Sequence, residues 1–140
     1  MSMQARVLVG LHHLGLTVRD VEQSARWYEG VLGFDEVGRL GKAGDARQKI
    51  FLRHPDLAIR LGLVQHRDGG TRRFDETHTG LDHLSFAVPT AAALRRWYEL
   101  LTDLEVVHSP IAEVRSIPDA RVVVFRDPDN IQLELFAQHS

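Results

Sequence analysis

The chain carries the same pattern twice. The stretch GLHHLGLTVRDVEQSARWYEGVLGFDEV, which starts at Gly10, aligns without a gap with GLDHLSFAVPTAAALRRWYELLTDLEVV, which starts at Gly80. A histidine recurs at one matched position as His13 and His83, whereas His12 is replaced by Asp82 in the second copy. Because each copy of a duplicated segment forms the same structural unit, the repeat predicts two similar modules.

The periodicity changes in the same order within each copy. Residues 11–18 alternate like a half-buried strand, Asp20 then caps a helix with one apolar face, and Gly33 ends that helix. Pro89 and Thr90 open the equivalent helix in the second copy. Three strand-like runs follow each helix, at 34–40, 47–54 and 57–65 in the first copy and at 104–110, 120–127 and 130–138 in the second. The sequence therefore predicts two tandem βαβββ modules in the α+β class.

Length and composition limit the number of domains and the possible partners. A chain of 140 residues is typical of one domain, with module one at about 8–66, a connector at 67–79 and module two at about 80–137. A net charge of −2 without a basic block argues against nucleic-acid binding, and the absence of cysteine excludes disulfides and thiolate metal sites. The first ten residues lack the long apolar stretch of a signal peptide, and no run is apolar enough to cross a membrane. We expect a cytoplasmic protein that does not bind membranes.

Strand alternation places three possible metal ligands on corresponding faces. His13 and His83 point away from the apolar residues that pack under each helix, and so does Glu134 on the last strand. If the two halves curl around a common hollow, two imidazoles and one carboxylate converge there, a set that holds a divalent metal with about three positions open. A histidine at a strand start is more often a hydrogen-bonded surface residue, and a lone glutamate can reach solvent. The recurrence of the histidine favours the metal, because burying an ionised glutamate without a cation is costly.

Other polar residues are candidates for substrate contact or proton transfer. The residues expected to contact a substrate are Thr17, Arg60, Ser85 and Val124. Arg60 could hold a substrate carboxylate, and Glu134 or His66 could act as the catalytic acid or base, although Arg60 and His66 would equally suit solvated strand ends. The remaining histidines are assigned to surface or loop positions: His12, His54, His78, His108 and His139.

Three segments resemble a known family. HHLGLTVRDVEQSARWYEGVLGF, DHLSFAV and FRDPDNIQLELF are similar to the vicinal oxygen chelate superfamily, which includes glyoxalase I, bleomycin resistance proteins, fosfomycin resistance transferases, methylmalonyl-CoA epimerase and extradiol dioxygenases. The resemblance implies paired βαβββ modules that form a curved mixed sheet. It also implies a metal held by residues matching His13, His83 and Glu134, and a homodimer whose site is completed within one chain or between two.

The resemblance breaks at one ligand position. Glyoxalase I has a further glutamate on the last strand of its first module, where this chain has Gly62. A missing carboxylate weakens the glyoxalase and epimerase readings and favours three-ligand enzymes of the dioxygenase or transferase type. The metal could be Fe(II), Mn(II), Zn(II) or Ni(II), with lyase or isomerase chemistry open as well. The alternatives are a metal-free protein that sequesters a ligand, as bleomycin resistance proteins do, and an inert scaffold that binds a partner.

Overall fold

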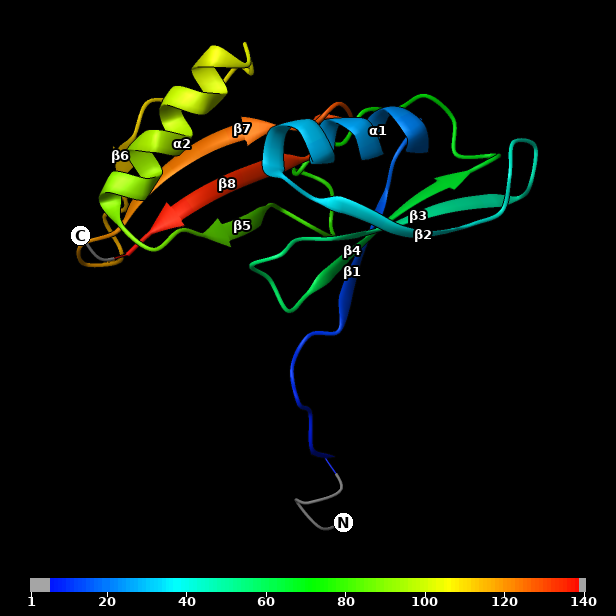
Figure 1. Cartoon of the computed structure of the whole chain (residues 1–140), viewed down its shortest axis with the longest axis horizontal. Helices are drawn as coiled ribbons and strands as arrows, with labels where there is room; N and C mark the ends of the chain where they lie inside the picture. Colours follow the sequence, from blue (N-terminus) through cyan, green and yellow to red (C-terminus); the bar gives the residue numbers. More distant parts are fainter. Residues whose placement is uncertain (1–5, 139–140) are drawn as a thin grey trace. The chain divides into compact units, whose positions relative to one another are not determined.

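The chain divides into two compact units whose boundary lies in the connector. In the computed structural model, which describes residues 6–138, unit 1 runs up to Gly70 and unit 2 starts at Thr71. Figure 1 draws the helices and strands of both units, and each unit is described by itself below. His139, expected at the surface, lies outside the described residues.

Unit 1 has the predicted order of elements. Its described residues form β1 (His13–Thr17), α1 (Val21–Trp27), the π-helical turn η2 (Tyr28–Leu32), β2 (Asp35–Leu40), β3 (Arg47–Arg53) and β4 (Arg60–His66). The four strands pair in the order β1-β4-β3-β2. β1 runs parallel to β4 and the other neighbours are antiparallel, so the sheet is mixed, as the resemblance implied.

The helical segment of unit 1 begins and ends where the sequence indicates. The Asp20 carboxylate accepts a hydrogen bond from the backbone N–H of Gln23, which satisfies one donor of the first turn. Gly33 ends the segment with a φ of 81°, a left-handed conformation that glycine adopts without strain. The π-helical last turn was not predicted. In it the Tyr28 side chain is fully buried, and α1 packs against β3 and β4.

Unit 2 repeats this arrangement. Its described elements are β5 (Leu84–Ala87), α2 (Ala91–Asp103), β6 (Ala112–Glu113), β7 (Arg121–Arg126) and β8 (Gln132–Ala137). The strands pair in the order β5-β8-β7-β6, and β5 runs parallel to β8. The Thr90 hydroxyl caps α2 by accepting from the backbone N–H of Ala93. The helix buries Leu94 and Leu101 and lies along β7 and β8 (Figure 1).

The strand predicted over residues 104–110 is wrong. Glu105 has a φ of 58°, which turns the chain directly after α2, and the short edge strand forms later, at Ala112 and Glu113. Between this turn and the short strand, the side chain of Ser109 takes the place of one backbone group in the hydrogen bonding to β7 (Arg121–Arg126). The Ser109 hydroxyl accepts from the backbone N–H of Val124 at 2.9 Å, while the Ser109 N–H donates to the Val124 carbonyl oxygen at 2.8 Å. The Ser109 side chain thus satisfies a backbone N–H of β7 that a strand at 104–110 would have satisfied with a carbonyl oxygen.

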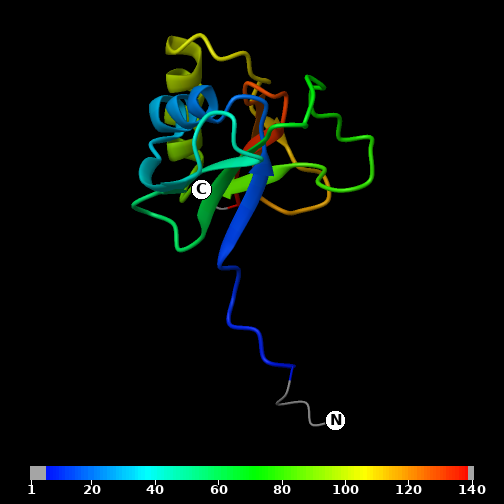
Figure 2. The same cartoon turned by 90° about the vertical axis from the view of Figure 1, so that its right-hand side faces the viewer.

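An extended apolar segment leads into β1. Residues 7–12 have no regular secondary structure and project away from the sheet of unit 1 (Figure 2). Its exposed apolar side chains are Val7, Leu8, Val9 and Leu11. Within residues 6–138, none of the helices has the length and apolar character needed to cross a membrane.

Candidate metal centre

The strand faces agree with the predicted alternation in both units. We call the side of each sheet that lies opposite its helix the open face. In unit 1, Leu16 is buried on the helix side, whereas His13 and Thr17 are exposed on the open face. In unit 2, Leu133 and Leu135 are buried and Glu134 between them is half-buried on the open face.

Unit 2 brings two of the predicted ligands together. The Nε2 atom of His83 lies 3.5 Å from Oε1 of Glu134, and its Nδ1 atom lies 2.7 Å from Oδ1 of Asp82. A carboxylate accepts hydrogen bonds, so the short contact to Asp82 places a proton on Nδ1. In the neutral imidazole Nε2 then carries a lone pair next to the Glu134 carboxylate. A cation between these two acceptors would satisfy both of them.

The distance between these two acceptors suits a shared metal ion. Two ligand atoms that each lie about 2.1 Å from a zinc-like ion in tetrahedral directions are about 3.4 Å apart. The hydrogen bond to Asp82 is also the outer contact that commonly fixes the tautomer of a metal-ligating histidine. His83 and Glu134 of unit 2 therefore fit a divalent ion. His83 would not need to change tautomer to bind it.

A chain of hydrogen bonds supports Asp82 from behind. The side-chain amide of Gln132 donates to Oδ1 of Asp82 at 3.3 Å, and Arg126 donates to the amide oxygen of Gln132 at 3.0 Å. Both terminal nitrogens of Arg126 also donate to the Glu76 carboxylate, at 2.8 and 2.9 Å. The Arg126 guanidinium lowers the pKa of Glu76 from its ordinary value to about 2. The connector residue Glu76 is thus linked to His83 through three intervening side chains.

The predicted substrate contacts of unit 2 share one row across the sheet. Ser85 on β5 and Val124 on β7 are the register partners of Glu134 on β8. Register partners point to the same face, about 5 Å apart. Ser85, Glu134 and Val124 therefore lie side by side on the open face of unit 2.

In unit 1, His13 lies beside Arg60. The two residues are register partners at the start of β1 and β4, and Nδ1 of His13 lies 3.0 Å from Nδ1 of His12. His12 is exposed, as expected, but it occupies the position relative to His13 that Asp82 occupies relative to His83. In both units the repeated histidine thus engages Nδ1 with the preceding side chain, and Nε2 is the nitrogen left for a ligand.

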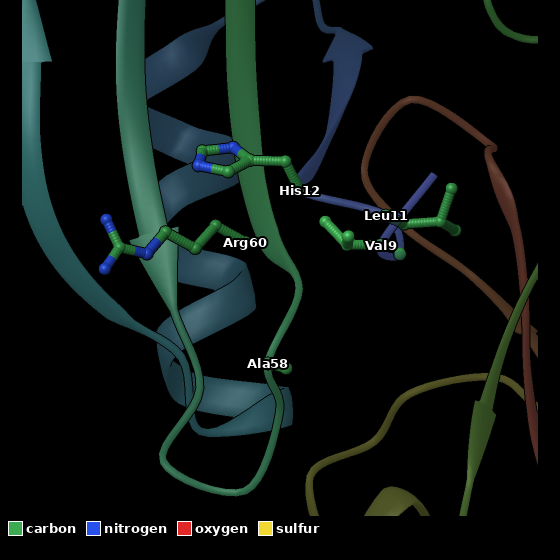
Figure 3. A pocket seen from close by; sticks show the side chains of 6 residues that line it. Val9, Leu11, His12, Ala58 and Arg60 are labelled. Atoms are coloured by element: carbon green, nitrogen blue, oxygen red, sulfur yellow. The ribbon is translucent and has the colours of Figure 1, made fainter. Parts of the chain in front are cut away.

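An open hollow of about 330 Å³ adjoins this part of unit 1. Figure 3 shows the side chains of Arg60 and His12 extending to the same side, with the apolar Val9 and Leu11 on the other side of the hollow. Arg60 therefore combines a position beside His13 with access to solvent, which suits a contact to an anionic ligand.

Two other predicted residues lie farther along the same face. Thr17 is the register partner of Val64, at the far end of β1 from His13. His66 ends β4 and pairs with Arg47. Since it follows Arg60 by six residues, it lies about 20 Å along the strand from the row that holds His13.

Gly62 occupies the place of Glu134 in unit 1. Gly62 pairs with Gly15 just as Glu134 pairs with Ser85, which confirms the alignment of the two closing strands. On its other side Gly62 pairs with Phe51, whose ring lies 3.8 Å from where a Cβ would stand. Unit 1 thus has an aromatic ring beside the position at which a fourth carboxylate ligand is lacking.

The predicted ligand set is divided between the units. Taken separately, neither unit gathers three or more His, Asp or Glu side chains able to hold a metal ion among its described residues. The set combines His13 of unit 1 with His83 and Glu134 of unit 2. Asp82, Gln132 and Arg126 were not predicted from the sequence. The replacement of His12 by Asp82 next to the repeated histidine was a signal for the first of these.

Comparison with known proteins identifies the family. The model of the Glyoxalase/Bleomycin resistance protein/Dioxygenase superfamily matches residues 10–135. A glyoxylase/bleomycin resistance protein/dioxygenase domain from Frankia sp. EAN1pec is 38% identical, with a TM-score of 0.83 over 95% of this chain and 100% of that one. The uncharacterized protein YwkD of Bacillus subtilis is 26% identical over 94% of this chain and 99% of its own length. The fosfomycin resistance protein FosX from Listeria monocytogenes, solved with Mn(II) and sulfate, shares the fold at 18% identity and a TM-score of 0.68, covering 94% of this chain and 93% of its own. The chain described here therefore belongs to the glyoxalase/bleomycin resistance protein/dioxygenase superfamily.

Proposed function

We propose that this chain is a cytoplasmic, metal-dependent enzyme whose His13, His83 and Glu134 hold one divalent ion. When bound, the ion would be chelated by oxygens of a small substrate and would stabilise negative charge developing on it, in dioxygenase-type or in lyase or transferase-type chemistry. The formal charge of two neutral imidazoles and one carboxylate leaves the bound ion with a net charge of +1, which favours an anionic oxygen ligand.

One observation carries the proposal. Asp82 engages Nδ1 of His83, while Nε2 faces the Glu134 carboxylate at 3.5 Å. A histidine that only lies in solvent at the start of a strand does not need a carboxylate beside each of its ring nitrogens. Binding of Mn(II) by FosX shows that a protein of this fold can hold such an ion, although at 18% identity that property belongs to FosX.

The chain's own residues have distinct parts in this proposal. Glu134 can accept a proton from the substrate, because one carboxylate oxygen remains when the other contacts His83. Arg60 holds an anionic group of the substrate beside His13, and Ser85 and Val124 line the row of Glu134. His66 is a poorer candidate for proton transfer, since it lies about 20 Å along β4 from the row of His13.

Metal analysis tests the proposal directly. Protein purified without chelator is expected to contain about one divalent ion per predicted site, and His83→Ala and Glu134→Ala are expected to lose it. His78→Ala, an exposed histidine of the connector, is the matched control. If wild type and all variants contain equal trace amounts of metal and cannot be loaded with Mn(II), Fe(II), Zn(II) or Ni(II), the proposal is wrong. A tight ligand that binds regardless of chelator and is not turned over would instead favour the sequestering protein.

We also propose that the chain forms a homodimer, and a mixing experiment locates the site within it. If His13 of one subunit acts with His83 and Glu134 of the other, a mixture of His13→Ala and His83→Ala chains regains one intact site per heterodimer. If all ligands come from one chain, the mixture binds no more metal than the separate variants. Size-exclusion chromatography coupled to light scattering measures the dimer itself, and a monomer at all concentrations would contradict it.

A further inference from the structure

Two carboxylates compete for the ring of His83. Its Nδ1 atom lies 2.7 Å from Oδ1 of Asp82, and its Nε2 atom lies 3.5 Å from Oε1 of Glu134. A neutral imidazole carries one N–H, so one carboxylate accepts from it and the other faces the nitrogen that keeps its lone pair. Only a nitrogen with a free lone pair binds a metal ion. Nε2 is therefore available beside Glu134 only while Asp82 keeps the proton on Nδ1.

The carboxylate nearer to the ring is also the more exposed one. The side chain of Asp82 is 68% exposed, against 16% for Glu134. Glu134 lies within β8, between the buried Leu133 and Leu135, whereas Asp82 precedes the first residue of β5. A hydrogen bond of an exposed carboxylate is weak on its own, because water competes for it. Asp82 can keep its place beside Nδ1 only if a further group holds it there.

Gln132 is the group that holds Asp82. The side-chain nitrogen of Gln132 donates to Oδ1 of Asp82 at 3.3 Å and to the backbone oxygen of Asp82 at 3.5 Å. Contacts from one nitrogen to the carboxylate and to the backbone of the same residue limit the rotation of that side chain. Oδ1 is also the oxygen that contacts Nδ1 of His83, so Gln132 acts on the bond that sets the tautomer.

Arg126 gives the amide of Gln132 its direction. The two residues are register partners on β7 and β8, and the guanidinium donates to the amide oxygen at 3.0 Å. Because a guanidinium has only donors, the amide turns its oxygen toward Arg126 and its nitrogen toward Asp82. A flipped amide would set donor against donor on one side and oxygen against carboxylate on the other.

The connector holds Arg126 in turn. Glu76 accepts from both terminal nitrogens of Arg126, at 2.8 and 2.9 Å. Two residues earlier, the backbone N–H of Phe74 donates to the carbonyl oxygen of Asp129 at 2.8 Å, and the Phe74 carbonyl oxygen accepts from the side chain of Asn130 at 3.0 Å. The connector is thus fixed to the turn between β7 and β8 by its backbone as well as by the ion pair.

The ion pair with Glu76 also restrains a charge that Asp82 attracts. The pKa of Arg126 is raised chiefly by its hydrogen bonds to Glu76 and, to a smaller extent, by the negative charges of Glu76 and Asp82. A guanidinium released from Glu76 would therefore be drawn toward Asp82 and would compete with His83 for its carboxylate.

We propose that Gln132 and Glu76 are positioning residues of the metal centre, which act on His83 through Asp82. Gln132 holds Asp82 against Nδ1 of His83, and Glu76 keeps Arg126 where it orients the amide of Gln132. The inference rests on the proposed function, because it names residues that prepare the ligand set of that site.

The tautomer of His83 tests this proposal without any metal. Two-bond nitrogen–proton NMR spectra of the full chain at about pH 9, where an ordinary imidazole is neutral, distinguish a proton on Nδ1 from one on Nε2. Wild type is expected to carry it on Nδ1. Gln132→Met keeps the length of the side chain but cannot donate, and should raise the Nε2–H population at least about twofold. Glu76→Gln should give a smaller rise, because its amide keeps one oxygen for Arg126.

Zinc affinity measures the consequence for the site. Gln132→Met is expected to raise the Zn(II) dissociation constant about two- to fourfold. In an Asp82→Ala chain the same substitution should have no further effect, because Gln132 then has no carboxylate to hold. A general loss of structure would persist in that background. Gln23→Met on α1 and Glu99→Ala on α2, both at exposed positions, are the matched controls and should change neither the tautomer nor the affinity.

The outcomes separate this inference from the proposed function. If wild type carries the proton on Nε2, or if Gln132→Met leaves the tautomer unchanged, the inference is overturned whether or not metal binds. In a protein that binds Zn(II), an unchanged dissociation constant, or an equal change in the Asp82→Ala chain, overturns it as well and leaves the metal site standing. If the tautomer shifts as expected in a protein that cannot be loaded with Zn(II) or Mn(II), the positioning of His83 is supported and the enzyme proposal is rejected.

Discussion

Replacing Asp82 by asparagine should weaken metal binding about two- to fivefold without changing the fold. The amide would keep the shape of the side chain and could still accept from Nδ1 of His83, but the hydrogen bond would lose its charge. A bond to a charged partner contributes about 1.5–3 kcal/mol and a neutral one about 1 kcal/mol, so the expected loss is on the order of 0.5–2 kcal/mol. The side chains of Asp82 and His83 are 68% and 41% exposed, so screening by water places the effect near the lower end. Since about 1.4 kcal/mol corresponds to a tenfold change in Kd, a loss of about 0.5–1 kcal/mol raises Kd about two- to fivefold.

Competition with a chromophoric chelator measures this change. The Zn(II) dissociation constant is determined for wild type, for Asp82→Asn and for Asp103→Asn, which removes an exposed carboxylate at the end of α2. Asp82→His, which copies the arrangement of His12 beside His13, should restore part of the affinity, because the new ring can engage Nδ1 of His83. Equal dissociation constants for wild type and Asp82→Asn would refute the argument that Asp82 fixes the tautomer of a metal ligand.

Three further predictions concern stability. Leu63→Ala removes a fully buried side chain of β4 and should lower the free energy of unfolding in urea by about 2–5 kcal/mol. Asp127→Ala leaves the backbone N–H groups of Asp129 and Ile131 without the carboxylate oxygen they share, and should cost about 1–3 kcal/mol by the same measurement. Because the pKa of Glu76 is lowered to about 2, its ion pair stabilises the fold above pH 4.5 and is lost as the pH falls toward 2. The hydrogen-exchange protection of residues 71–79, relative to the intrinsic rate at each pH, should therefore fall over that range in wild type and not in Glu76→Gln.

Much of the fold could be predicted because the sequence contains the same pattern twice. The alternation of Leu14, Leu16 and Val18 against His13 and Thr17 is a local pattern, and backbone geometry alone converts it into two faces. The caps at Asp20 and Thr90 are local as well, since each accepts from a backbone N–H three residues on. Patterns of this kind need no knowledge of which strands pair.

The errors arose where long-range partners decide the structure. The run 104–110 has the composition of a strand, yet its Val107 is 89% exposed and Ser109 bonds to Val124, 15 residues away. The series of hydrogen-bonded side chains behind His83 could not be predicted for the same reason, because Gln132 and Asp82 are 50 residues apart. The coincidence of Phe51 with Gly62 also follows from strand register, which the sequence did not specify.

The boundary at Gly70 and Thr71 has a practical consequence. The backbone pairings of both sheets and the caps of both helices join residues on the same side of that boundary, so each unit contains its own sheet and its own helix caps. Two half-length polypeptides could then be produced separately. In the proposed site each would bring an incomplete set of ligands, and recovery of metal uptake on mixing would make the pair a split reporter for association.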